Sequence, residues 1–254
     1  MILKFFSIIS LIILILPILI LIYLGLFVYK SPQVLSYTFF SSLILTLVSS
    51  SIAMLVNIFL FTPLAYFLSR NNNKLIESIV DLPATIPHPI VGIALVFLTS
   101  PYTPIGKVLN SLGISLFDNL LGLVYALVIV SAPIYIKTLK SYFDALPSSY
   151  EYFAKSLGTN EIKLLLMIVL PLSIRGLITS ALISMARAMS EFGSVAIIAY
   201  YILQPPFERV SPVSVIIFDY YTFYGPGPAI TASSIMVLVG LAYSYIVRII
   251  EKSR

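Results

Sequence analysis

The sequence has no cysteine and few charged residues, and these two absences exclude several classes of protein. Without cysteine, the 254-residue chain can form neither a disulfide framework nor a thiolate metal site. Charged residues make up 10% of the chain, whereas an ordinary soluble domain carries about 25%. Because 59% of the residues are hydrophobic, the sequence predicts an integral membrane protein.

Motifs for catalysis and nucleotide binding are missing as well. The chain contains no Gly-x-x-x-x-Gly-Lys-Ser/Thr loop, so no nucleotide site is expected. The single histidine, His88, has no neighbouring metal ligands, and no nucleophile and base form a catalytic pair. The net charge of +5 sits at the ends of apolar runs rather than in a basic stripe, which disfavours nucleic acid as a partner. We therefore expect no enzyme, no cofactor and no metal.

Long apolar runs predict an all-α, polytopic membrane protein with about six transmembrane helices in a single domain, 1–254. Each span needs about 20 residues to cross the hydrocarbon. The first run is too long for the hydrophobic part of a signal peptide, so it is expected to be retained. The predicted spans are 5–28, 37–68, 84–99, 120–136, 168–189 and 230–250.

The basic residues predict how these spans are oriented. If the N-terminus is cytoplasmic and the spans alternate, eleven of the 15 lysines and arginines fall on the cytoplasmic side. Lys30, Lys107 and Arg209 fall outside, and Arg187 lies within a span. Both termini and the charged segment 137–167 are therefore predicted to be cytoplasmic, in a cell membrane that the chain crosses several times.

A short polar helix is expected at 148–163, directly before the fifth span. Ala154 and Gly158 are four residues apart and share a helix face, where small side chains would let the helix seat in a soluble partner. Gly158 can also adopt the left-handed conformation that ends a helix. Pro171 can start the following helix because its missing N–H is harmless there. An ordinary interfacial amphipathic helix between two spans is the alternative.

The stretch EYFAKSLGTNEIKLLLMIVLP, residues 151–171, resembles the EAA loop of binding-protein-dependent ABC importer permeases. That pattern is Glu-Ala-Ala, three residues, Gly, nine residues and Ile-x-Leu-Pro. The chain departs from it because Tyr152 stands at the strict glutamate position and Glu151 lies one residue early. The resemblance implies that an ATPase docks at Glu151, Tyr152, Ala154, Gly158, Leu170 and Pro171.

The resemblance covers roughly residues 37–250 and is most similar to permeases of the molybdate/tungstate importers. It is carried by 82–98 (LPATIPHPIVGIALVFL), 100–114, 130–158 and 186–201 (ARAMSEFGSVAIIAYY). Sulfate permeases are the nearest alternative, because all three anions are tetrahedral dianions. The resemblance implies the membrane-spanning subunit of an ATP-driven importer, with two copies of this chain, two cytoplasmic ATP-binding subunits and an extracellular oxyanion-binding protein.

Two charges inside the fifth span are the candidate pathway residues. Arg187 and Glu191 are four residues apart, and charges in hydrocarbon are costly unless they are paired or face a cavity. They either neutralise each other within the bundle or, together with Ser190, line a pathway for the anion. His88, between two prolines, is expected to be structural. A secondary transporter or channel would need more such groups at mid-membrane, so it is the weaker alternative.

Overall fold

The computed structural model describes residues 2–71 and 73–252. Met1, Asn72, Ser253 and Arg254 lie outside the described residues, and with them the outermost residues of both predicted cytoplasmic termini. Within the described ranges the chain is almost entirely helical, and its β pairing there is one isolated bridge between Ile202 and Val210. The all-α prediction is confirmed.

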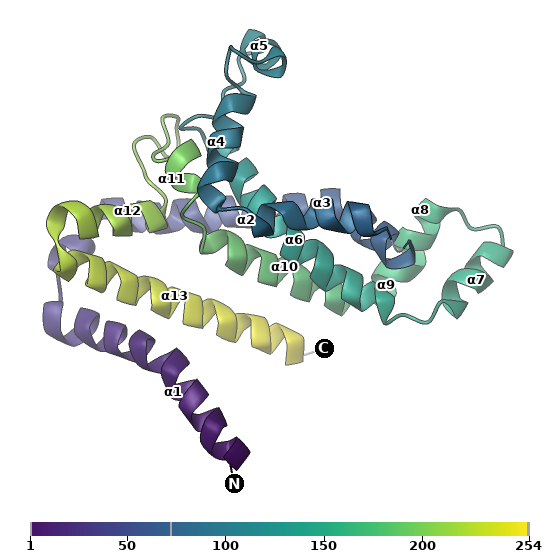
Figure 1. Ribbon diagram of the computed structural model, residues 1–254, viewed down its shortest axis with the longest axis horizontal. Coiled ribbons are helices and arrows are strands. Elements are labelled where there is room, and N and C mark those ends of the chain that lie inside the picture. Colours follow the sequence, from purple (N-terminus) through teal and green to yellow (C-terminus); the bar gives the residue numbers. More distant parts are fainter. Residues whose placement is uncertain (1, 72, 253–254) are drawn as a thin grey trace.

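Four helices are long and apolar enough to cross a membrane by themselves. In Figure 1, α2, α6 and α13 run along the long axis of the molecule, whereas α1 diverges from α13 toward the N-terminus. They correspond to the first, second, fourth and sixth predicted spans, although α6 continues well beyond 136. Their bounds are α1 Ile2–Tyr23, continued by a π-helical segment Leu24–Tyr29, α2 Tyr37–Arg70, α6 Leu120–Asp144 and α13 Pro226–Lys252.

The third predicted span is broken. Helix α3 (Lys74–Thr85) and helix α4 (His88–Leu98) meet at an angle of 102°. The proline at 87 restricts the preceding residue to extended backbone, and Ile86 indeed has φ −88° and ψ 151°, which ends α3. The prediction of one helix over 84–99 is therefore wrong: 84–85 end one helix and the next begins at His88.

The fifth predicted span is also bent, by 83°, between Glu161–Leu172 and α10 (Ile174–Met189). The first arm contains α8 (Glu161–Leu164), a π-helical segment (Leu165–Val169) and α9 (Leu170–Leu172). The π-turn shifts the hydrogen-bond ladder, and Pro171 follows it in the first turn of α9, where its missing N–H costs little. Pro171, expected to start the following long helix, instead starts the short α9, and the bend falls at Ser173.

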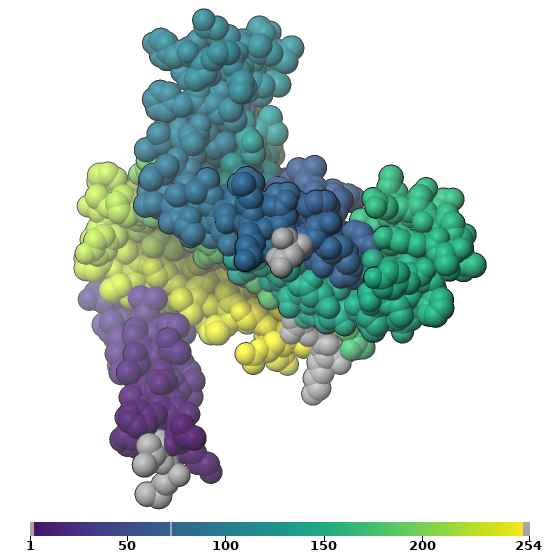
Figure 2. Space-filling model, turned by 45° about the vertical axis from the view of Figure 1, so that its right-hand side comes forward, coloured from purple at the N-terminus to yellow at the C-terminus, as the bar shows by residue number. Residues whose placement is uncertain are grey.

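Two regions between the predicted spans contain short helices. Helix α5 (Pro104–Ser111) interrupts 100–118, and α12 (Val213–Asp219) with a π-helical segment (Tyr220–Tyr224) interrupts 204–228. A further short helix, α11 (Val195–Ile198), follows α10. Figure 2 shows the arm formed by α4 and α5 projecting from the rest of the molecule.

Polar side chains join α2 to α6 inside the bundle. Asn57 Nδ2 donates to Ser131 Oγ at 2.8 Å, and the hydroxyls of Thr62 and Tyr135 lie 2.6 Å apart. Hydrocarbon offers polar groups no other partner, so these pairs favour one alignment of the two helices. The two helices therefore form a well-defined unit against which α10 packs.

The π-helical end of α1 packs closely against α13 at Gly25. A Cβ added to Gly25 would lie 2.0 Å from Ser234 Oγ and 2.8 Å from the carbonyl oxygen of Ile230. Ser234 Oγ itself donates to the carbonyl oxygen of Leu21 at 2.8 Å. This close contact between the two helices therefore requires that residue 25 has no side chain.

We expect Gly25→Ala to lower the free energy of unfolding by about 1–3 kcal/mol, because the backbone of α13 cannot move aside without cost. Thermal unfolding of the purified chain in detergent measures the change. Gly240→Ala, in α13, is the matched control, since nothing lies within 4 Å of its added Cβ. It should be neutral or slightly stabilising; an equal loss in both variants would contradict the close packing.

Candidate functional site

The polar helix predicted at 148–163 is two short helices rather than one. Helix α7 spans Ser149–Ser156, and α8 begins at Glu161. Between them Gly158 has φ +81°, and its N–H donates to the carbonyl oxygen of Lys155 at 2.9 Å. Gly158 therefore has the predicted left-handed conformation after α7, because residues with a Cβ rarely adopt it. Figure 1 shows α7 at one end of the molecule.

The α7 face that carries Ala154 points toward the bundle rather than outward. Ala154, expected to seat in a partner, is 6% exposed and packs in the chain's own core with Leu164 and Val169. Tyr152 and Phe153 are each 72% exposed. The small residue thus brings α7 close to the bundle, and an aromatic face points away from it. Two other predicted docking residues lie on α9, where Leu170 is half-buried and Pro171 is exposed.

Glu151 also faces the bundle. Its carboxylate accepts a hydrogen bond from Arg70 Nε at 2.6 Å and one from the Tyr66 hydroxyl at 2.7 Å, both on α2. Burial opposes the charged form, but the donors on Arg70 and Tyr66 outweigh it and lower the pKa of Glu151 below its ordinary value. Glu151 therefore fastens α7 to the bundle and does not lie on the outward face.

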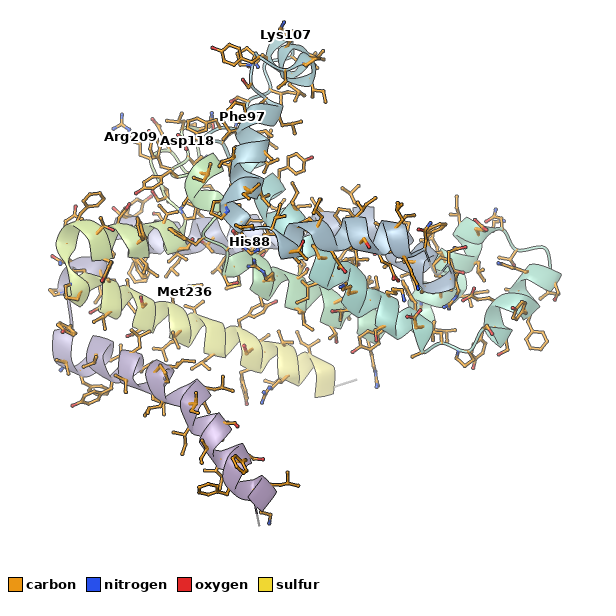
Figure 3. All side chains as sticks on the ribbon, viewed as in Figure 1. His88, Phe97, Lys107, Asp118, Arg209 and Met236 are labelled. Atoms are coloured by element: carbon orange, nitrogen blue, oxygen red, sulfur yellow. The ribbon has the colours of Figure 1, made fainter. Side chains whose placement is uncertain are left out.

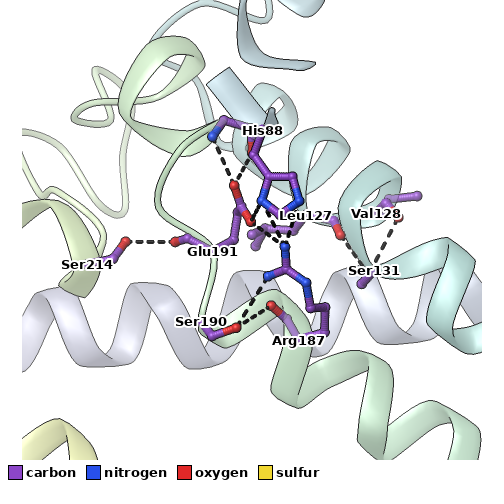
Figure 4. A network of polar contacts seen from close by, with 9 residues as sticks. His88, Leu127, Val128, Ser131, Arg187, Ser190, Glu191 and Ser214 are labelled. Carbon is purple, nitrogen blue, oxygen red and sulfur yellow. Dashed lines mark hydrogen bonds and ion pairs between the residues drawn. The ribbon is translucent and has the colours of Figure 1, made fainter. Parts of the chain in front are cut away.

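At the other end of α10, three charged or titratable side chains meet around Glu191 (Figure 4). The Glu191 side chain is 1% exposed, and Arg187 Nη2 and His88 Nδ1 lie 3.0 and 2.9 Å from its Oε2. Its Oε1 accepts from both the backbone N–H and the hydroxyl of Ser194, each at 2.9 Å. Both carboxylate oxygens therefore have partners, as a buried charge requires.

His88 is the member of this network that sequence reasoning did not connect to Arg187 and Glu191. It is the first residue of α4, and the bend at 86–87 places it beside the end of α10. Its two ring nitrogens lie 2.9 and 3.0 Å from Arg187 Nη2. The only signal in the sequence was a histidine between two prolines, and this does not reveal a contact across 99 residues.

The network presents a donor-rich outer edge. The side chains of Arg187 and His88 are 26% and 29% exposed, and Ser190 is exposed. Ser190 Oγ donates to the carbonyl oxygen of Arg187 at 2.9 Å and lies 3.3 Å from Arg187 Nη1. Glu191 is therefore buried, whereas Arg187 and Ser190 reach the surface of the chain. Among the described residues no group of acidic, histidine or cysteine side chains could hold a metal ion.

The family model for binding-protein-dependent transport system inner membrane components matches residues 61–254. The molybdate/tungstate transport system permease protein WtpB of Pyrococcus furiosus is 28% identical over 78% of this chain and 72% of its own length. The molybdenum transport system permease protein ModB of Azotobacter vinelandii is 31% identical over 69% of this chain and 78% of its own. The sulfate transport system permease protein CysT of Synechocystis is 28% identical over 82% and 72%.

Solved structures with the same fold come from ABC transporters. A bacterial ABC transporter for import of the polysaccharide alginate superposes with a TM-score of 0.75, at 17% identity, over 99% of this chain and 95% of that chain. The MetNI methionine ABC transporter superposes with a TM-score of 0.63, at 16% identity, over 87% and 96%. At these identities the likeness shows the fold alone.

We expect Glu191→Ala to lower the free energy of unfolding by about 3–5 kcal/mol, because it leaves Arg187 without its carboxylate. Ser190→Ala, three residues from Arg187 on the exposed edge, should change it by no more than about 0.5 kcal/mol. Thermal unfolding in detergent compares the two variants. Similar small changes in both would show that Glu191 is not the structural centre of the network.

Proposed function

Since this chain belongs to the family of binding-protein-dependent transport system inner membrane components, we propose that it is the membrane-spanning permease subunit of an ATP-driven importer for a tetrahedral oxyanion. Molybdate or tungstate is the proposed cargo. The observation that carries this choice is the similarity along most of the chain to permeases named for these anions. Sulfate is the second candidate, because sulfate permeases align over a similar length.

The partners proposed are a second copy of this chain, two cytoplasmic ATP-binding subunits and an extracellular oxyanion-binding protein. The need for an ATPase follows from the lack of a phosphate-binding loop in this sequence. The exposed aromatic face of α7, with Tyr152 and Phe153, supports docking of that subunit there. Gly158 ends α7, and Leu170-Pro171 lie beyond the π-segment that leads back to the bundle.

In this proposal, ATP-driven closure of the ATP-binding subunits moves α7 and alternates the bundle between inward-open and outward-open states. Movement reaches α10 through the bend at Ser173, and the far end of α10 carries Arg187 and Ser190. Their exposed donors would contact the anion as it passes. Because Glu191 already balances the charge of Arg187, the contact would be weak enough to release the cargo.

The test is uptake by the complete complex in liposomes that enclose an ATP-regenerating system, with radiolabelled molybdate outside and sulfate as competitor. Gly158→Val places a Cβ at φ +81°, which costs about 1–2 kcal/mol, so the docked conformation should be roughly tenfold less populated and uptake should fall accordingly. Gly113→Val, at φ +72° near α5, is the matched control and should transport normally. Uptake by this chain without an ATPase would instead support a secondary transporter.

The orientation is proposed from the basic residues, with both termini and α7 in the cytoplasm. Lys107 and Arg209, both expected outside, lie away from the α7 end of the molecule in Figure 3. The cysteine-free chain allows single-cysteine labelling with a membrane-impermeant maleimide. Ser111→Cys on α5 should react in intact cells, and Ser156→Cys on α7 only after permeabilisation. The opposite result would reverse the proposed topology.

A further inference from the structure

We infer that the ion pair between Arg70 and Glu151 is a positioning pair that makes α2 and α6 follow the movement of α7. The inference rests on the proposed function, in which α7 is the docking helix. It assigns to these two residues a role in coupling ATP hydrolysis to transport, and it places that role inside this chain rather than at the surface that contacts the ATPase.

Helix α7 has few attachments to the rest of the chain. Glu151 and Ala154 are its buried residues within the described part of the chain. Ala154 makes an apolar contact that can slide, since dispersion contacts have little direction. The Glu151 carboxylate instead accepts a directional, charge-assisted hydrogen bond from Arg70 Nε, and Arg70 Nη2 completes the ion pair. Among the side chains of α7, Glu151 is therefore the best suited to transmit a pull.

Arg70 connects three helices. It is the last residue of α2, its Nε and Nη2 lie 2.6 and 2.5 Å from Glu151 Oε1, and its Nη1 donates to the carbonyl oxygen of Phe143 at 3.0 Å. Phe143 is in the last turn of α6 and stacks edge-on against Tyr66 of α2. Tyr66 donates in turn to Glu151. A displacement of Glu151 therefore acts on the ends of α2 and α6 together.

The two helices that receive this displacement form one unit. Asn57 and Ser131, and then Thr62 and Tyr135, hold α2 to α6 farther along the bundle. The covalent route from α7 to α10 passes instead through a π-helical segment and the bend at Ser173. Breaks of this kind can act as hinges that absorb part of a movement before it reaches α10. The ion pair thus transmits the movement of α7 directly to α2 and α6. These two helices then move together with α10.

The position of Glu151 in the sequence explains why its carboxylate faces Arg70. Successive helix residues are about 100° apart around the axis. Tyr152, at the position where the EAA pattern has its glutamate, is 72% exposed, whereas Glu151 is 7% exposed. Moving the acidic residue by one position therefore turns it from the outward face of α7 to the face toward Arg70.

The test measures molybdate transported per ATP hydrolysed, using the complete complex in liposomes, for Glu151→Gln and Arg70→Lys. Lysine keeps the charge but cannot reproduce the fork geometry of Arg70. Both variants should keep complex assembly and ATP hydrolysis, while transport per ATP falls by about threefold to thirtyfold. The exchanged pair, Arg70→Glu with Glu151→Arg, should recover part of the loss. Asp144→Asn, which removes the exposed pair Lys140–Asp144 within α6, is the matched control and should match the wild type.

Tyr66→Phe provides a milder variant should the others fail to fold, because it removes one hydrogen bond and leaves the ion pair intact. It should reduce transport per ATP by a smaller factor, with a loss of thermal stability no larger than one hydrogen bond to a charged group contributes. Unchanged transport per ATP in all folded variants would overturn the inference, and so would parallel losses of hydrolysis and transport. The wild-type complex is measured first, so a failure of the proposed function, seen as no ATP-dependent uptake, is distinguished from a failure of this inference.

Discussion

The structure depends on one constraint, which is that a polar or charged group in hydrocarbon must find its partner within the protein. Glu191 shows this most clearly. To satisfy its two carboxylate oxygens, the chain brings together the end of α10, the start of α11 and the first residue of α4. The broken third span is thereby fixed at its corner, and the arm of α4 and α5 starts from this point.

The helix breaks follow from proline combined with local geometry. Pro87 ends α3 because it restricts Ile86 to extended backbone. Pro171 causes no break, since a π-turn precedes it and α9 begins around it. Proline therefore marks places where a helix can change direction, and the surrounding packing decides whether it does. The result is a bundle with two sharp bends, one beside the charged network and one on the side of the bundle that carries α7.

Helix α7 has two faces of different chemistry. Its aromatic face is exposed, and its buried face carries Ala154 and Glu151. Since Glu151 reaches Arg70 at the end of α2, the exposed surface and the connection to the bundle are separate properties of a helix of eight residues. In the proposed function, docking and coupling therefore depend on different side chains of the same helix.

The sequence by itself determined the membrane class, the helical fold and the left-handed turn at Gly158, and it gave the pairing of Arg187 with Glu191 as one of two alternatives. These depend on composition or on residues close together along the chain, where hydropathy, glycine conformation and helix spacing act locally. The tertiary structure decided that His88 joins Glu191, that Ala154 and Glu151 face inward, and that the spans bend at 86–87 and 173. These features depend on contacts between distant segments, such as His88 with Arg187 and Arg70 with Glu151. Local spacing contains no information about which helices lie side by side, so only the folded chain reveals them.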